Sequence, residues 1–151
     1  MSEQKSKNIA KTLDIIFICS SIIFNISISF LYIAAKFDNA KVLQVLGAIV
    51  IFLIIPYTLI LIGYLKQKEK RKITISLAVV LIYLFLELLL DFILMIPFRD
   101  ILVLHIPYII VFYAAEFSII SVSFDKNKKL GFVVLITFFV LLGCLIYMFV
   151  G

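Results

Sequence analysis

Five long apolar stretches fill nearly the whole chain. They cover residues 13–35, 42–65, 73–96, 101–124 and 130–150. An α-helix needs about 20 apolar residues to cross the hydrocarbon core of a bilayer, because each residue advances the helix by about 1.5 Å. Every stretch reaches that length. The sequence therefore predicts an all-α integral membrane bundle of five transmembrane helices, forming a single domain over residues 1–151.

The hydrophobic content excludes an ordinary water-soluble domain. Of the 151 residues, 65% are hydrophobic and 15% are charged, and the mean hydropathy is +1.25. A soluble domain of this size has too little interior to bury so much apolar surface. The lipid bilayer is therefore the first expected partner, and the short connections between the stretches leave no room for a separate soluble domain.

Lysine and arginine are concentrated on one set of connections. Eleven of the fourteen lie in the N-terminal tail, between the second and third stretches, or between the fourth and fifth: Lys5, Lys7, Lys11, Lys66, Lys68, Lys70, Arg71, Lys72, Lys126, Lys128 and Lys129. Positive loops favour the cytoplasmic side of a membrane. We therefore expect a cytoplasmic N-terminus and a C-terminus outside, in the plasma membrane. The same pattern accounts for the net charge of +5 without a nucleic-acid partner.

The third and fourth stretches form the tightest predicted hairpin, joined at residues 97–100. Pro97 should end or kink the helix before it, because proline has no N–H to donate and restricts the preceding residue. Asp100 is the expected N-cap of the next helix. Pro56 and Pro107 lie inside their stretches and are expected to bend them. In this hairpin Asp91 lies level with His105.

Three of the stretches carry a polar face. Positions three, four or seven apart share one side of a helix, because each residue turns it by about 100°. Such faces are formed by Asp14, Ser21, Asn25, Ser29 and Tyr32 in the first stretch, by Ser76, Tyr83, Glu87 and Asp91 in the third, and by His105, Tyr108, Phe112, Glu116 and Ser123 in the fourth. We expect these three helices to turn their polar faces toward a shared interior.

Ionisable residues within the apolar stretches indicate a functional site. A charged side chain at the centre of a membrane helix costs about 2.5–3.5 kcal/mol on insertion scales, so such residues are rarely kept without a purpose. The candidate ligand-binding or proton-relay residues are Glu87, Asp91, His105, Glu116, Asn25, Tyr108 and Tyr83. Their spacing resembles no metal-site signature, and the sequence predicts neither a metal nor a cofactor.

The charge balance predicts the chemistry of this interior. Several carboxyl groups have at most one internal histidine as a partner, and Arg99 lies at the edge of its stretch, where it could reach Asp91. Carboxylates in a low-dielectric interior cannot all stay ionised without compensation. Some should therefore hold protons, or a bound cation should balance them. Asp91 and His105 are expected to pair, either as a functional group or as a structural lock.

The leading hypothesis is a membrane protein that binds, and can translocate, a cation, a proton or a cationic small molecule. Glu87 would be the principal charge, Glu116 an inner relay, and Asp91 with His105 an outer pair. A homo-oligomer or another membrane protein would complete a transport path. Two other classes stay open. One is an intramembrane enzyme that uses carboxylate acid–base chemistry on a lipid or isoprenoid. The other is a non-catalytic accessory, immunity or assembly subunit.

Overall fold

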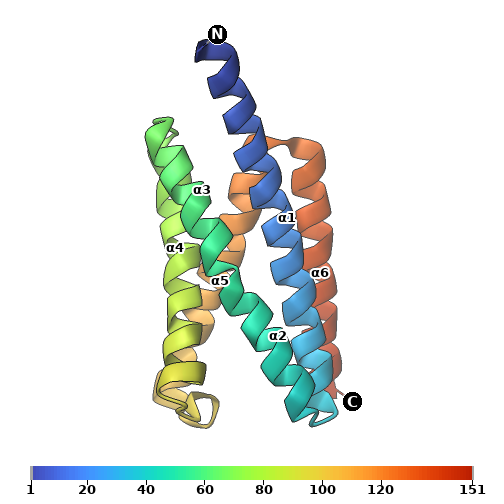
Figure 1. The fold of residues 1–151 in the computed structure, drawn as a ribbon. Coiled ribbons are helices and arrows are strands. Elements are labelled where there is room, and N and C mark those ends of the chain that lie inside the picture. Colours follow the sequence, from blue (N-terminus) through green and yellow to red (C-terminus); the bar gives the residue numbers. More distant parts are fainter. Residues whose placement is uncertain (1, 151) are drawn as a thin grey trace.

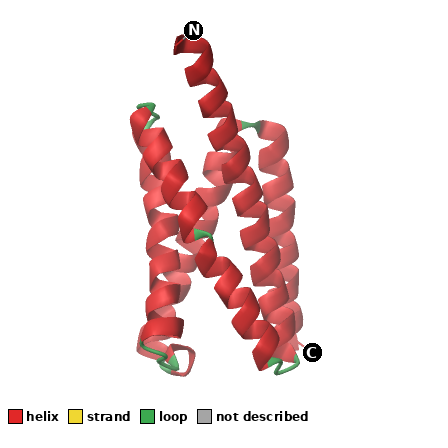
Figure 2. Cartoon of the chain, viewed as in Figure 1, coloured by secondary structure: helices red, strands yellow, loops and turns green. Residues whose placement is uncertain are grey.

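The computed structural model describes residues 2–150 and is almost entirely helical, at 91% helix (Figure 2). Within these residues the α-helices are α1 (Ser2–Lys36), α2 (Ala40–Phe52), α3 (Ile54–Lys66), α4 (Arg71–Glu87), α5 (Leu102–Lys126) and α6 (Lys128–Val150). Five segments, counting α2 and α3 together, are long and apolar enough to cross a membrane. The predicted all-helical bundle with five candidate spans is therefore confirmed.

The connections between helices gather at two ends of the bundle (Figure 1). One end holds residues 37–39, residues 94–101 and the end of α6, and is called the Pro97 end. The other holds the start of α1, residues 67–70 and Asn127, and is called the Asn127 end. Asn127 caps α6 there, since its Oδ1 accepts from the N–H groups of Lys129 and Leu130 at 3.0 and 3.2 Å.

Helix α1 is the centre of the bundle, because it packs against α2, α3, α5 and α6. Its buried side chains include Phe17, Ser21, Phe24, Asn25 and Ile28, each of which lies three or four residues from another of the set. This spacing places them on one helix face. The predicted polar face of the first stretch is thus the interior face of α1. The polar faces of α4 and α5 also contribute buried residues, including Glu87 and Glu116.

The second stretch is broken into α2 and α3 at Leu53. Pro56 explains the break, because its ring nitrogen cannot donate to the Phe52 carbonyl and the ring crowds that carbonyl. The chain tightens instead, with the Leu53 N–H donating to the Val50 carbonyl at 3.2 Å. The bend predicted at Pro56 is confirmed as this break. Helix α5, in contrast, continues through Pro107 without interruption.

Helix α4 does not run on as an α-helix to residue 96. It continues into a six-residue π-helical segment, η1 (Leu88–Ile93), before a connection that contains the short 3₁₀ turn η2 (Phe98–Asp100). The helix therefore ends before Pro97, as expected. The predicted cap is wrong, because Ile101 occupies the cap position of α5 and Asp100 belongs to η2.

Packed ion pairs join the helices at the Asn127 end. The Lys126 ammonium lies 2.6 Å from Glu69 Oε1 and 3.4 Å from Asp14 Oδ1, and its side chain is only 10% exposed. The Tyr64 hydroxyl donates to the same Asp14 oxygen at 2.6 Å. Asp14 therefore contacts α3 and α5.

The outer faces of the helices are apolar. Large side chains such as Phe30, Phe52, Phe85 and Phe117 are more than half exposed, at 54, 69, 55 and 60%. A contiguous apolar surface of this kind is suited to contact with lipid rather than water. Together with the five candidate spans, it indicates a membrane protein.

Candidate functional site: an acidic cavity at the Pro97 end

A cavity of about 600 Å³ lies at the Pro97 end, between α1, α2, α4, η1, α5 and α6. Apolar side chains form most of its wall, including Leu31, Leu43, Phe92, Ile109, Leu145 and Met148. Nine lining residues carry a polar group, and four of them are tyrosines with largely apolar rings: Tyr32, Gln44, Tyr83, Glu87, Asp91, Arg99, His105, Tyr108 and Tyr113. An apolar cavity with a few convergent polar groups is the usual form of a small-molecule site.

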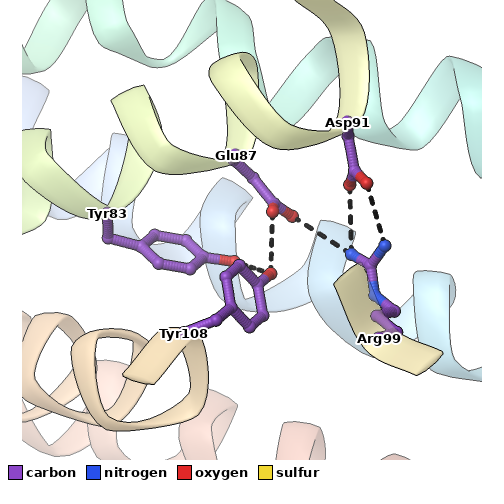
Figure 3. Close-up of polar contacts among 5 residues, drawn as sticks. All are labelled: Tyr83, Glu87, Asp91, Arg99 and Tyr108. Atoms are coloured by element: carbon purple, nitrogen blue, oxygen red, sulfur yellow. Dashed lines mark hydrogen bonds and ion pairs between the residues drawn. The ribbon is translucent and has the colours of Figure 1, made fainter. Parts of the chain in front are cut away.

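Glu87 is the most enclosed charge of the cavity, with its side chain 7% exposed. Its Oε2 accepts a hydrogen bond from the Tyr108 hydroxyl at 2.8 Å (Figure 3). The Tyr83 hydroxyl lies 3.0 Å from that of Tyr108. Because Tyr108 has one hydroxyl hydrogen and gives it to Glu87, Tyr83 is the donor in this second bond. Two phenols therefore hold the carboxylate in place.

Arg99 reaches both acidic residues from the connection between α4 and α5 (Figure 3). Its guanidinium makes two hydrogen bonds to Asp91, at 2.9 and 3.1 Å, and lies 3.7 Å from Glu87 Oε1. Burial acts to lower the pKa of Arg99, but the hydrogen bonds to Asp91 and the nearby acidic groups outweigh it and raise that pKa. Arg99 therefore stays charged and is engaged mainly with Asp91.

His105 lines the cavity but does not pair with Asp91, so the expected Asp91–His105 pair is wrong. The bidentate Arg99 contact occupies the Asp91 carboxylate instead. The His105 ring lies nearly parallel to that of Tyr108, with centroids 6.4 Å apart. Its Nδ1 is buried and, among residues 2–150, has no hydrogen-bond partner.

Local backbone structure explains how Arg99 reaches the cavity. Glu87 and Asp91 are four residues apart, at the junction of α4 and η1. The following connection folds back on this segment, with the Ile96 N–H donating to the Leu90 carbonyl at 3.0 Å and the Phe98 side chain fully buried. These anchors direct Arg99 toward the two carboxylates. π-Helical insertions are often found at functional sites.

Glu116 and Asn25 lie outside this cavity, in a second polar cluster. Both are fully buried, and Asn25 contacts Thr137 of α6. The structure thus brings together Glu87, Asp91, His105, Tyr83 and Tyr108 at one site and Glu116 with Asn25 at another. Sequence reasoning missed the contact of Arg99 with Glu87, the place of Gln44 in the cavity wall and the contact of Thr137 with Asn25. Thr137 is an isolated hydroxyl on an otherwise apolar helix, which was the available signal.

No protein-family model, no curated protein and no solved structure matches this chain.

Proposed function

We propose that this chain is a five-span membrane protein whose cavity binds an amphiphilic organic cation, with the N-terminus cytoplasmic and the Pro97 end outside. The concentration of lysine and arginine at the Asn127 end supports this orientation. The apolar cavity wall would take the body of the ligand, and the acidic group would take its charge.

The charge balance of the cavity carries the proposal. Two carboxylates, Glu87 and Asp91, face a single guanidinium. Arg99 directs both of its short hydrogen bonds to Asp91 and approaches Glu87 only to 3.7 Å. One negative charge therefore lacks a close internal counter-ion. A cation binding beside Glu87 would supply it, and the attraction is strong where water is largely excluded.

The shape and lining of the cavity favour an organic cation. Its volume of about 600 Å³ lies within the range of small-molecule pockets. Aromatic rings from Tyr32, Tyr83 and Tyr108 border it, and such rings attract organic cations through their faces. His105 Nδ1 could accept a hydrogen bond from an N–H group of the ligand.

The same features bear on the other hypotheses. The burial of Glu87 and Glu116 disfavours a subunit that uses these acids to dock a partner helix, since such charges would lie on an outer face. Translocation of the ligand would require a second conformation, because the Lys126 ion pairs join the helices at the opposite end. Binding is therefore the step to measure first.

A pair of ions of the same shape and opposite charge tests the proposal. Tetraphenylphosphonium is a lipophilic cation, and tetraphenylborate is an anion of nearly equal size. We expect the purified protein in lipid nanodiscs to bind the cation in preference to the anion, as measured by equilibrium dialysis. Glu87→Gln should weaken cation binding about tenfold, which corresponds to about 1.4 kcal/mol.

Glu3→Gln is the matched control, because Glu3 lies at the exposed start of α1, at the opposite end of the bundle. It should leave the affinity for tetraphenylphosphonium unchanged. Equal affinity of the native protein for the two ions, or an unchanged affinity in Glu87→Gln, would contradict the proposal.

A further inference from the structure

Glu116 is a fully buried carboxyl group without a basic partner. Within residues 2–150 no lysine, arginine or histidine nitrogen lies within 4 Å of its oxygens. Two titratable groups on neighbouring helices interact electrostatically with Glu116. They are the phenols of Tyr32 on α1 and Tyr57 on α3. Its polar neighbour is the Asn25 amide, which in turn contacts Thr137. The ligand proposed for the cavity plays no part in this cluster.

The position of the Asn25 amide is compatible with two orientations, which exchange its nitrogen and oxygen between Glu116 and Thr137. In one, its nitrogen donates to the Thr137 hydroxyl at 2.8 Å and to the Val134 carbonyl at 3.4 Å, and its oxygen faces Glu116. In the other, the amide is rotated by half a turn. Its nitrogen then donates to both Glu116 oxygens at 3.1 Å, and its oxygen accepts from Thr137 at 2.8 Å.

Each orientation suits one protonation state of Glu116. An ionised carboxylate only accepts hydrogen bonds, so it requires the Asn25 nitrogen. A protonated carboxyl carries an O–H donor, and the Asn25 oxygen can accept from it. The hydrogen bond donated by the Thr137 hydroxyl also changes its acceptor. When Asn25 presents its nitrogen to Thr137, the hydroxyl donates to the Val134 carbonyl at 2.7 Å, and in the rotated state it donates to Asn25 instead.

We infer that Glu116, Asn25 and Thr137 form a proton-binding site in which uptake of one proton by Glu116 reverses the direction of the hydrogen bonds joining α1, α5 and α6. The proton comes from water and forms the carboxyl O–H bond. The Asn25 amide and the Thr137 hydroxyl rotate, and no other covalent bond changes.

A proton fits this place better than a metal ion. Glu116 and Asn25 are fully buried and do not line the cavity. A metal ion needs several oxygen ligands arranged around a space of its own, whereas a proton occupies no additional volume. The inference does not rest on the proposed function, since the cavity could bind a cation with Glu116 in either state.

Infrared difference spectroscopy during a pH titration tests the inference. The experiment uses the Glu87→Gln protein, so that the other buried acidic side chain, Glu87, does not contribute. We expect the carbonyl band of a protonated, buried carboxyl group to disappear as the pH rises. An asparagine amide band should change over the same pH range. Glu116→Gln should abolish both signals.

Thr137→Val provides a second test that keeps Glu116 in place. It should retain the carboxyl band and alter the accompanying amide change, because the Thr137 hydroxyl that hydrogen-bonds to Asn25 in both orientations is absent. A carboxyl band that persists in Glu116→Gln would overturn the inference, as would a carboxyl titration without any amide change. So would spectral changes that follow sodium concentration at constant pH.

Discussion

At the scale of single residues, Arg99 sets the negative charge that the cavity can offer to a ligand. Its bidentate contact neutralises Asp91 and leaves Glu87 with Tyr108 as its closest hydrogen-bond donor. The guanidinium also lies over the Phe98 ring, 4.4 Å from its centroid. Arg99 therefore joins the connection to η1 and reduces the net negative charge of the cavity.

Removing the charge of Arg99 should strengthen cation binding. Arg99→Gln deletes a positive group that competes with the ligand and frees the Asp91 carboxylate. Since half-exposed ion pairs are worth up to about 1 kcal/mol, we expect affinity for tetraphenylphosphonium to rise by up to about fivefold in equilibrium dialysis. Arg99→Lys, which keeps the charge, should stay close to the native value. A loss of affinity in Arg99→Gln would show that Arg99 does not compete with the ligand.

At the scale of secondary-structure elements, two interrupted helices border the cavity. The break at Leu53 separates α2 from α3, and α2 supplies Leu43, Gln44 and Gly47 to the wall. The segment η1 supplies Asp91 and Phe92 from the facing side. Gly47 lies opposite Phe92, because a Cβ built on it would be 3.4 Å from the edge of that ring.

Filling the cavity from Gly47 should block binding by size rather than by charge. In Gly47→Leu the Cβ fits against Phe92, and the rest of the side chain must occupy cavity space. We expect affinity for tetraphenylphosphonium to fall by at least about tenfold, or 1.4 kcal/mol. Gly143→Leu is the control, because a Cβ there meets no atom within 4 Å. Equal affinities in these two variants would place the binding site outside the cavity.

The helices and their interior faces could be predicted from the sequence, because length and periodicity depend on residues close together in the chain. Asn25, Glu87 and Glu116, one from each predicted polar face, are buried as expected. The η1 segment and the fold-back that brings Arg99 to Glu87 could not be predicted. Each depends on a shift of backbone hydrogen bonds, which neither the residue composition nor the spacing of polar residues indicates.

The division of the polar residues into two clusters was also hidden from sequence reasoning. Residues on one helix face can lie at different depths and meet different neighbours. Glu116 contacts α1 and α6 through Asn25 and Thr137, whereas Glu87 meets Tyr108 across the hairpin. The periodicity of a helix face predicts the side of the helix on which a residue lies. The residue that it contacts on another helix depends on how the whole bundle packs.

At the scale of the whole molecule, the two ends of the bundle differ. The Pro97 end contains the acidic cavity, and the Asn127 end is joined by Lys126 with Asp14 and Glu69. A cavity at one end and packed ion pairs at the other are the arrangement expected of a protein that takes a ligand from one side of a membrane. The proposed orientation would make that side the outside.

The most direct test of the acidic cavity is to locate a bound cation. Tetraphenylarsonium has the shape and charge of tetraphenylphosphonium, and its arsenic atom can be found by anomalous X-ray scattering from co-crystals. We predict a single arsenic position inside the cavity, beside Glu87 and among Tyr32, Tyr83 and Tyr108, and its loss in Glu87→Gln. Arsenic found only on the outer helix faces, or in the same place in Glu87→Gln, would contradict the proposal.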